Sequence, residues 1–494
     1  MKTATLEEIT NLCIRRGFFF PSGKIYGGLS GFYDYGPLGV ELRNEILNSW
    51  WNFFVRNRED IVGIHGSILT HPKTWEASGH TESFIDIIVK CTRCNSEFRA
   101  DLLLEDKGIK ITELTIENLR NLIKKHNIKC PICKGELSDP EPFNLMFQTY
   151  VGPKKTKANI AYLRPETAQL IFTNFKNIYI SMRLKLPFGV AQIGKAFRNE
   201  ISPRNFLFRV REFEQMEIEY FVNPHKLNDC PLFNEVKDIK INLLTAKLQE
   251  NSIEKTIEIT IEDAYEKGLI TTKWHAYWIG KSIEWMLKIG LDATKIRVRE
   301  HMKNELAHYA IQTFDIEYYF PDMGWKEIEG ISNRGDYDLS RHQKFSGKDL
   351  TIPDNDKKVI PYVIEPSFGL ERIILALLTS SYREIDNRKV LSLKPFIAPI
   401  KAGVYPLIKK PEFIEKAREV YYLLREKINV FYDESGSIGK RYARADEIGV
   451  PLGITIDGES LENNTVTVRF RDTKQQIRIK LDNLWEDIKK ILEE

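Results

Sequence analysis

The stretch AFRNEISPRNFLFRVREFEQMEIEYF, residues 196–221, interleaves charged and apolar side chains. Side chains two apart in a strand share a face, so we interpret 192–200 and 208–221 as two antiparallel strands joined by the turn-forming ISPRNFL. One face of the second strand then carries Arg209, Arg211, Phe213, Gln215, Glu217 and Glu219. The other face carries Val210, Met216, Ile218 and Tyr220. The chain must therefore fold around a sheet with one charged face and one apolar face.

The charged face has two possible interpretations, a solvated surface or the floor of a binding site. An aromatic ring within the row, Phe213, and the close mixture of guanidinium and carboxylate groups favour a binding site. Arginine binds phosphate oxygens through two parallel hydrogen bonds, and carboxylates accept hydrogen bonds from an ammonium group. The pattern therefore predicts a pocket for a ligand with phosphates, a flat ring and an amine.

Length and composition set wide limits on the rest. The 494 residues are 42% hydrophobic and carry a net charge of +3, which is typical of a globular protein of two or three domains. Nucleic acid, if bound, must be bound by local basic patches. The N-terminus has no signal-like apolar segment, and the longest apolar runs are too short to span a bilayer. We expect a soluble, cytoplasmic protein without a membrane partner.

Periodicity divides the chain into segments. Leu38, Leu42, Ile46, Trp50 and Phe54 recur every four residues and predict a helix over 38–57. We further predict a short strand at about 61–69 and a mostly antiparallel sheet of strands and turns over 141–221. A mixed insertion at 224–310 and a helix beginning near 370 follow. A linker at 392–399 then leads to alternating strands and helices from about 396. The last pattern is typical of a separate α/β domain.

Four of the six cysteines fall into two CxxC pairs, Cys91 with Cys94 and Cys130 with Cys133. Two such pairs are typical of a structural zinc ion held by four thiolates and favour a metal over disulfides. The 35 residues between the pairs exceed what a compact zinc ribbon needs, so they should contain a helix. The alternative is four reduced cysteines without a metal.

Several segments, in order, resemble one enzyme family. FRNE and FRVREFEQ (197–200 and 208–215) resemble motif 2 of the class II aminoacyl-tRNA synthetases. The surrounding sequence resembles the homodimeric glycyl-tRNA synthetases in GFYDYGPLG (31–39), WEASGH (75–80), LRPETAQ (163–169), GISNRGDYDL (330–339) and EPSFGLER (365–372). The resemblance covers nearly the whole chain and is weakest at 100–130 and 225–310.

The resemblance implies an α+β fold with a class II catalytic domain, built on an antiparallel sheet flanked by helices, and a C-terminal α/β anticodon-binding domain. The implied domains are a catalytic domain at 1–90 and 140–395 and an anticodon-binding domain at 396–494. The catalytic domain would contain motif 1 at about 36–72, motif 2 at about 192–221 and motif 3 at about 363–380. Two insertions are implied, a zinc-binding-like one at 91–139 and one at 224–310 near the tRNA acceptor stem. Motif 1 forms a homodimer interface in the family.

For ATP, the resemblance implies two catalytic arginines, Arg198 at the α-phosphate and Arg372 at the adenine and γ-phosphate. Glu200 would accept a hydrogen bond from the adenine amino group, Arg209 would contact the γ-phosphate, and Phe213 would stack on adenine. The remaining implied ATP contacts are Asn199, Phe208, Val210, Arg211, Glu212, Glu327, Ile328, Gly369, Leu370 and Glu371. Glu327 would also bind magnesium, and Glu371 could instead serve only to start the helix.

For glycine, the resemblance implies that Glu166 and Glu217 bind the ammonium and that Ser367 lines the Cα side. Arg99 would be a substrate-pocket arginine, or alternatively an ion-pair partner of Asp101. The remaining implied glycine contacts are Phe213, Glu214, Gln215, Met216, Glu365, Pro366, Phe368 and Gly369. Phe368 is larger than a residue expected near so small a substrate, unless its ring points away.

The implied reaction is the ATP-dependent ligation of glycine to tRNA(Gly) through a glycyl-adenylate. Two alternatives remain: a synthetase for threonine, proline, serine or another small amino acid, and a non-catalytic RNA-binding relative. In the C-terminal domain, Lys440, Arg441 and Arg444 form a basic cluster that would contact tRNA phosphates, or would be a solvated helix face.

Overall fold

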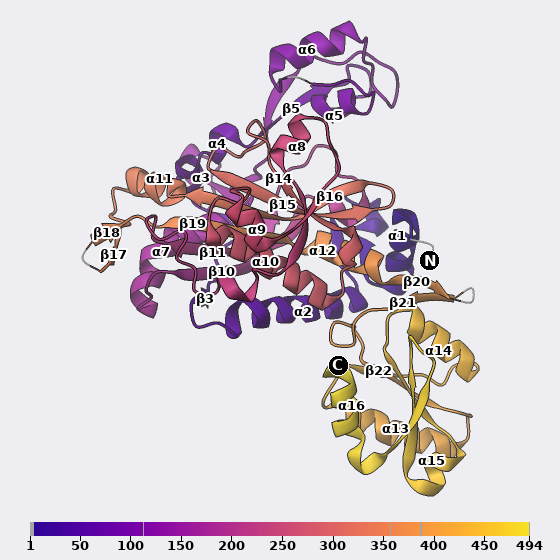
Figure 1. The fold of residues 1–494 in the computed structure, drawn as a ribbon. Helices are drawn as coiled ribbons and strands as arrows, with labels where there is room; N and C mark the ends of the chain where they lie inside the picture. Colours follow the sequence, from indigo (N-terminus) through magenta and orange to yellow (C-terminus); the bar gives the residue numbers. More distant parts are fainter. Residues whose placement is uncertain (1–3, 112, 356, 386–387, 494) are drawn as a thin grey trace.

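The computed structural model describes residues 4–111, 113–355, 357–385 and 388–493. Figure 1 shows three parts: a large central body around a long sheet, a small lobe that carries α5 and α6 at the top, and a C-terminal domain with α13 to α16 at the lower right. Among the described residues, no helix is both long and apolar enough to cross a bilayer.

The central body is organised by a nine-stranded sheet. Its strands, in spatial order, are β13 (Ile257–Thr260), β12 (Lys240–Leu244), β14 (Ile296–Glu300), β15 (Gln312–Phe320), β16 (Gly324–Gly335), β19 (Tyr362–Gly369), β11 (Glu212–Val222), β10 (Phe188–Phe197) and β3 (Ile61–Gly63). Neighbouring strands are antiparallel except β12 with β14 and β10 with β3. The α+β class predicted from the sequence is confirmed.

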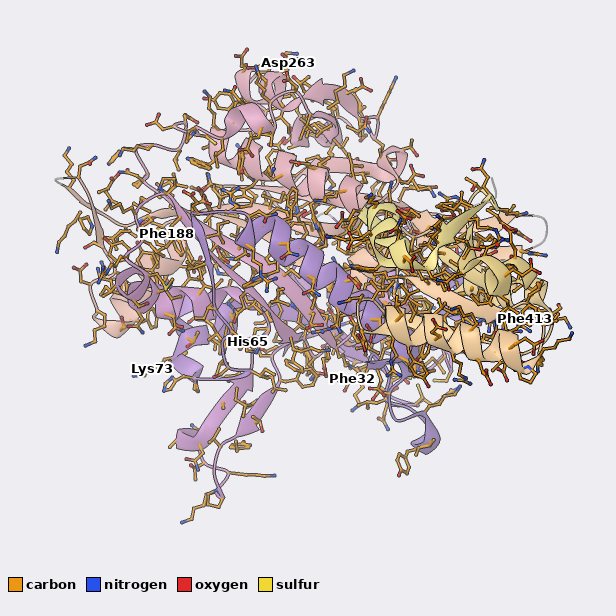
Figure 2. All side chains as sticks on the ribbon, turned by 90° about the horizontal axis from the view of Figure 1, so that it is seen from below. Phe32, His65, Lys73, Phe188, Asp263 and Phe413 are labelled. Atoms are coloured by element: carbon orange, nitrogen blue, oxygen red, sulfur yellow. The ribbon has the colours of Figure 1, made fainter. Side chains whose placement is uncertain are left out.

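One face of this sheet is apolar, as the alternation in β11 predicts. Met216, Ile218 and Tyr220 are wholly buried in the main core. The helices that close this core are α2 (Pro37–Trp51), α10 (Lys273–Ile289) and α12 (Leu370–Ser381). In Figure 2, Asp263 of α9 (Ile261–Glu266) and Lys73 of α3 (Pro72–Ser78) lie on opposite sides of the central body.

The opposite face of β10 and β11 changes character along its length. Toward one end, Phe188, Val190 and Phe221 pack with α7 (Ala168–Met182) and Leu339 of α11 (Tyr337–Ser346) in a second apolar core. Toward the other end, the same face carries Gln215 and Glu217. The polar side chains of this face are thus bordered by an apolar core on one side.

The helix predicted over 38–57 is present, as α2 followed by a π-helical turn at Asn52–Arg56. Several other boundaries differ from the predictions. The strand predicted at 61–69 is two short strands in different sheets, β3 and β4 (Leu69–Thr70). The first strand of motif 2 ends earlier than predicted and the second begins later, so that 198–211 is a loop between β10 and β11. The predicted run of strands over 141–221 is wrong at α7, a helix whose β-branched and aromatic residues resemble strand composition.

The segment 224–310 is built into the central body. It supplies β12, β13 and β14 to one edge of the nine-stranded sheet, and α10 to the main core, where Trp274, Trp278 and Trp285 are buried. Its other helices are α8 (Ala246–Glu250) and α9. The sequence sets this segment apart because its polar stretches interrupt the pattern, whereas the fold joins it to the sheet by strand pairing.

Smaller elements complete the central body and the lobe. They are α1 (Leu6–Arg16), β1 (Phe19–Pro21), β2 (Tyr33–Tyr35), α4 (His80–Ser83), β5 (Ile85–Lys90), β6 (Glu97–Arg99), α5 (Ala100–Glu105), α6 (Ile116–Lys125), β7 (Glu141–Asn144), β8 (Gln148–Tyr150), β9 (Ile160–Leu163), β17 (Ile352–Asp354), β18 (Lys357–Val359), β20 (Tyr382–Ile385) and β21 (Arg388–Leu391). Two helices, α5 and α6, lie between the two CxxC pairs, which confirms the helix predicted there.

The C-terminal domain has its own five-stranded sheet and its own apolar core. Its elements are β22 (Ala402–Pro406), α13 (Pro411–Arg425), β23 (Val430–Tyr432), α14 (Ile438–Glu447), β24 (Leu452–Ile456), α15 (Gly458–Asn463), β25 (Thr465–Phe470), β26 (Gln476–Lys480) and α16 (Leu484–Glu493). The α/β pattern predicted from residue 396 is confirmed. Lys401 pairs with Glu45 (Nζ to Oε1, 3.1 Å), and Glu447 contacts Arg15 and Arg16, so ion pairs join this domain to the central body.

Candidate active site

A cavity of about 280 Å³ opens over the polar face of the nine-stranded sheet, and we call it the sheet cavity. Its lining comes from β11, β15, β16 and β19, from the start of α12, from Glu166 before α7, from the loop 198–211 and from the segment 301–309. The antiparallel register places Glu217 opposite Ser367 and Gln215 opposite Gly369. Motif 2 and motif 3, which are about 150 residues apart in the sequence, therefore meet at the floor of one cavity.

One end of the sheet cavity is cationic and aromatic. The guanidinium carbon of Arg198 lies 5.2 Å from the ring centre of Phe213, and that of Arg372 lies 4.6 Å from the ring centre of Phe208. Arg209 also lines this end. Guanidinium groups suit phosphate oxygens, and ring faces suit a flat base. This end can therefore hold a nucleotide with several phosphates.

Carboxylates hold two of these arginines in place. Arg209 donates from Nε to Glu200 Oε2 at 2.7 Å, and Arg372 pairs through Nη1 with Glu327 Oε2 at 3.0 Å. Arg198 donates from Nε to the carbonyl of Pro165 at 3.1 Å. The three guanidinium groups are thus positioned before any ligand arrives, which lowers the cost of ordering them around developing charge.

The other end of the sheet cavity is acidic and largely buried. Glu217 accepts hydrogen bonds from Ser367 Oγ at 2.8 Å and from the hydroxyl of Thr167. Glu166 accepts from Gln169 Nε2 at 3.0 Å and contacts His80 Nε2 at 3.1 Å. Carboxylates that keep free lone pairs in a nearly dry site are suited to bind a small cation such as an ammonium group.

The carboxylates at this end differ in their ease of ionisation. Burial raises the pKa of Glu365 to about 8, although Arg334 opposes the shift. Burial and the nearby charge of Glu166 also raise the pKa of Glu217. Glu166 behaves differently, because the contact with His80 outweighs burial and holds its pKa below the usual range. Incoming positive charge would therefore be favoured by the whole acidic end.

The segment LRPETAQ reaches the cavity floor because Arg164 fixes it under β10. Arg164 is fully buried and donates from Nε to the carbonyl of Lys195 at 2.6 Å and from Nη1 to the carbonyl of Gly66 at 2.8 Å. A Cβ atom at Gly194 would lie 2.1 Å from Arg164 Nη2, so only glycine leaves room for the guanidinium there. This contact places Glu166 and Thr167 beside the sheet.

The structure adds functional candidates that the sequence did not single out. Arg334 is buried and donates from Nη1 to Glu365 Oε1 and from Nε to Asp338 Oδ2, both at 2.7 Å. Its guanidinium carbon lies 3.7 Å from the ring centre of Tyr309. His301, which contacts Asp315 at 2.8 Å, also lines the cavity. Arg334 and Asp338 fall within GISNRGDYDL, and opposite charges four residues apart can form an ion pair. This spacing could have indicated the pair from the sequence.

The structure brings most of the sequence-predicted side chains to the cavity lining. These are Glu166, Arg198, Glu200, Phe208, Arg209, Val210, Phe213, Gln215, Glu217, Glu327, Glu365, Ser367, Gly369, Glu371 and Arg372. Glu371 also accepts from Tyr35 Oη at 2.8 Å and from the Glu214 amide at 2.9 Å. These bonds join the start of α12 to β2 and β11, in line with the helix-start alternative.

Four predicted contacts are corrected, because their side chains lie in the main apolar core and not in the cavity. They are Met216, Ile328, Phe368 and Leu370. The Phe368 ring packs at 5.5 Å from Phe54 and 5.4 Å from Trp285, so its size does not restrict the cavity. Only the backbone of Phe368 can border the site.

Five further predicted residues lie outside the cavity lining: Asn199, Arg211, Glu212, Glu214 and Pro366. Glu214 is on the apolar face, where Arg43 of α2 donates to it from Nε at 2.5 Å. Arg211 donates to the carbonyls of Glu200 and Ser30, at 2.8 and 2.7 Å, and so ties the motif 2 loop to the Gly-rich loop. Their even-numbered parity or their backbone contacts turn them away from the site.

Arg99 also lies outside the sheet cavity. It pairs with Asp86 (Nη1 to Oδ2, 3.0 Å) and with Asp101 (Nη2 to Oδ2, 2.5 Å) in the lobe. The alternative of an ion-pair partner for Asp101 therefore describes its place in this structure.

The four CxxC cysteines meet in the lobe. Their sulfur atoms all lie within 4.8 Å of one another, with Cys91 to Cys133 at 3.4 Å and Cys94 to Cys130 at 3.7 Å. A tetrahedral ion with Zn–S bonds of about 2.3 Å requires sulfur atoms roughly 3.8 Å apart. The cluster therefore has the donor type and the spacing of a zinc site.

Comparison with known proteins agrees with the geometry. Residues 154–381 match the family described as "tRNA synthetase class II core domain (G, H, P, S and T)", and residues 396–491 match the "Anticodon binding domain". The glycine–tRNA ligase of Treponema denticola is 44% identical over 98% of this chain and 96% of the relative. The ligase of Geobacillus thermodenitrificans is 45% identical over 97% of this chain and 96% of the relative. That of Thermobifida fusca is 42% identical over 98% of this chain and 97% of the relative.

The antiparallel sheet, its cavity and the separate C-terminal domain thus define a class II aminoacyl-tRNA synthetase. Full-length similarity narrows the class to one amino acid, because the relatives match along the catalytic and C-terminal domains alike. The chain belongs to the glycine–tRNA ligase family.

Proposed function

We propose that the sheet cavity is where this enzyme forms glycyl-adenylate from ATP and glycine, before the glycyl group passes to tRNA(Gly). One observation carries the proposal: a cationic, aromatic end and a buried acidic end share one cavity floor. ATP would occupy the first end and glycine the second. Their reacting groups would then meet between Arg198 and Glu217, so that positioning and charge stabilisation drive the reaction.

At the ATP end, Arg198 would stabilise the negative charge that develops on the α-phosphate as the glycine carboxylate attacks. Arg209 and Arg372 would bind the remaining phosphates, with Phe213 and Phe208 as ring surfaces for adenine. Magnesium fits this end because Glu327 and Asp315 offer carboxylate oxygens to the cavity, the ligand type this ion prefers. When bound, the ion would neutralise phosphate charge.

At the glycine end, Glu217 and Glu365 would accept the ammonium, with Glu166 behind them. Ser367 would border the Cα side. A side chain on the substrate would have to enter a floor already filled by the hydrogen bonds among Thr167, Glu217 and Ser367. Exclusion by contact with fixed atoms can be strong, which favours glycine over larger amino acids.

The test is ATP–pyrophosphate exchange with a panel of amino acids. We expect exchange with glycine at least about 10³-fold faster in kcat/KM than with alanine or serine, a difference of about 4 kcal/mol. Exchange with threonine, proline or serine that equals exchange with glycine would favour a different synthetase. A protein that binds tRNA but supports no exchange would be a non-catalytic relative.

We propose that Cys91, Cys94, Cys130 and Cys133 hold a structural zinc ion that stabilises the lobe. Metal analysis should find one zinc per chain. Cys91→Ser should lose the zinc and become more sensitive to proteolysis within 91–139, because the ion would tie the two CxxC pairs together through all four thiolates. Cys230→Ser, a cysteine outside the cluster, is the matched control. Equal zinc content in both variants would contradict the proposal.

We propose that tRNA(Gly) spans the two domains, with its anticodon at 396–494 and its acceptor stem near 224–310. The basic cluster predicted in the C-terminal domain is only partly available for it. Lys440 is exposed, whereas Arg441 is buried and donates to the carbonyls of Glu434 and Gly436. Lys440→Ala should therefore weaken tRNA binding without changing ATP–pyrophosphate exchange.

We also propose a homodimer through motif 1, at about 36–72. The support is a group of exposed apolar side chains around the β4–β9–β8 sheet: Ile68, Leu69, Tyr150 and Val151, of which Leu69 and Val151 line one surface hollow. Adjacent exposed apolar residues indicate an interaction surface. Sedimentation equilibrium that finds a monomer at micromolar concentration would contradict this assignment.

A further inference from the structure

One glutamate near the acidic end has no part in the roles assigned so far. Glu219 follows Glu217 by two residues on β11 and so lies on the same face, just beyond the residues that line the sheet cavity. Its side chain is fully buried, and neither carboxylate oxygen has a hydrogen-bond partner among the described residues. An unpartnered carboxylate in a dry site cannot remain ionised without a nearby positive charge.

The immediate neighbours of Glu219 increase this difficulty. The register that pairs Glu217 with Ser367 and Tyr220 with Ile364 sets Glu219 opposite Glu365 on β19. Oxygens of Glu217, Glu219 and Glu365 all lie within 4.8 Å of one another. Two carboxylates opposed across neighbouring strands repel each other unless a proton or a cation lies between them.

The titratable groups that face Glu219 and Glu365 come from every element packed around them. They are Glu217 on β11, Arg334 on β16, Asp338 on α11, Glu166 before α7 and Tyr309 before β15, while β10 contributes Val190 and Gln192, which are uncharged. Arg334 is the single cation among them, and all three of its nitrogens already donate to Asp338 and Glu365. Beyond Glu219, Phe221 lies in the apolar core with α7, so water does not reach it from that side.

We propose that Glu219 and Glu365 share one proton in the free enzyme, and that the glycine ammonium displaces this proton when it binds. The balance is one zwitterionic glycine bound and one proton released. The proton leaves to solvent through the sheet cavity, which Glu365 lines. Glu219 is thus a positioning residue that couples glycine binding to pH. The inference rests on the proposed ammonium site at Glu217 and Glu365.

The sign of the pH dependence follows directly. Burial raises the pKa of Glu365 to about 8 and the pKa of Glu219 well above its usual range, so the shared proton is present at pH 6 to 7. Below about pH 8, glycine must displace it, and the KM for glycine should rise by up to about tenfold for each unit that the pH falls. Above about pH 8, Glu365 has already ionised, and the KM should level off.

The decisive variant is Glu219→Gln, measured by glycine-dependent ATP–pyrophosphate exchange from pH 6 to 8.5. Glutamine keeps the size and can donate an amide hydrogen bond to Glu365, which favours the ionised form of Glu365 and lowers its pKa. We expect a KM for glycine that is nearly independent of pH. At pH 6 the variant should bind glycine more tightly than the wild type, because no proton has to leave. At pH 8.5 it should bind less tightly, because one negative charge is missing.

Glu329→Gln is the matched control. Glu329 is also a fully buried glutamate of the same sheet, with one oxygen unpartnered within the described part of the chain, but it lies on the apolar-core face with Ser282. This variant should keep the wild-type pH slope. Calorimetry of glycine binding to the wild type at pH 7, in two buffers of different ionisation enthalpy, should show release of close to one proton.

Three results would overturn the proposal: a wild-type KM for glycine that is flat from pH 6 to 8.5, no proton release on binding, or a Glu219→Gln variant that keeps the wild-type slope. If Glu219→Gln does not fold, the wild-type slope and the proton count still decide. Failure of the underlying assignment looks different, since it would appear as no glycine-dependent exchange at any pH.

Discussion

Arg198→Ala should lower the kcat/KM of glycine-dependent ATP–pyrophosphate exchange by about 10³-fold, which corresponds to about 4 kcal/mol. The reason is that Arg198 is a guanidinium fixed between the ring of Phe213 and the carbonyl of Pro165, at the end of the sheet cavity that would hold phosphates. A fixed positive charge contributes most where negative charge grows in the transition state, and water that enters in its place cannot reproduce its orientation.

The measurement for Arg198→Ala is steady-state exchange, with folding checked by thermal unfolding. Arg418→Ala is the control, since Arg418 is exposed on α13 of the C-terminal domain and is not part of the cavity lining. On the same energy scale, it should change kcat/KM by less than about twofold. A loss of less than about tenfold in Arg198→Ala would show that another group stabilises the α-phosphate.

Glu217→Gln should raise the KM for glycine by about 100-fold, or about 3 kcal/mol, and leave the KM for ATP within about threefold. Glu217 is buried at the acidic end, and Ser367 and Thr167 fix its carboxylate by donating hydrogen bonds. Glutamine retains the shape but presents an uncharged amide to the ammonium, so the loss falls on glycine.

The comparison of the two KM values separates the two ends of the cavity. Glu258→Gln, on the exposed edge strand β13, controls for removal of a glutamate charge and should alter neither KM. If Glu217→Gln weakens ATP as much as glycine, the division of the sheet cavity into a nucleotide end and an ammonium end is wrong.

Alternation along 212–221 was sufficient to predict the two faces of β11, because side chains in a strand must point alternately up and down. It placed Phe213, Gln215 and Glu217 on the same face, as the structure does. The same rule, applied to residues 214 and 216, would have excluded Glu214 and Met216 from the site. Those two predictions came from the family resemblance, which names positions without their orientation.

Pairings between distant segments could not be predicted from local pattern. Arg164 under Gly194, Arg334 with Glu365, and His80 with Glu166 each depend on backbones that approach only in the folded chain. Helix α7 was missed for a related reason. Its first turn is buried on all sides, whereas Ile180 and Met182 near its end are exposed, so the amphipathic period that marks a surface helix is weak.

The sequence by itself determined the fold class, the order of the domains, the four-cysteine cluster and most of the residues of the sheet cavity, because period, spacing and motif are properties of the linear chain. Tertiary structure alone decided the charge state of the cavity floor. Glu217, Glu219 and Glu365 become a coupled group only when β11 and β19 pair and α7 excludes water from one side. Ionisation depends on distance and solvation, which a sequence does not contain.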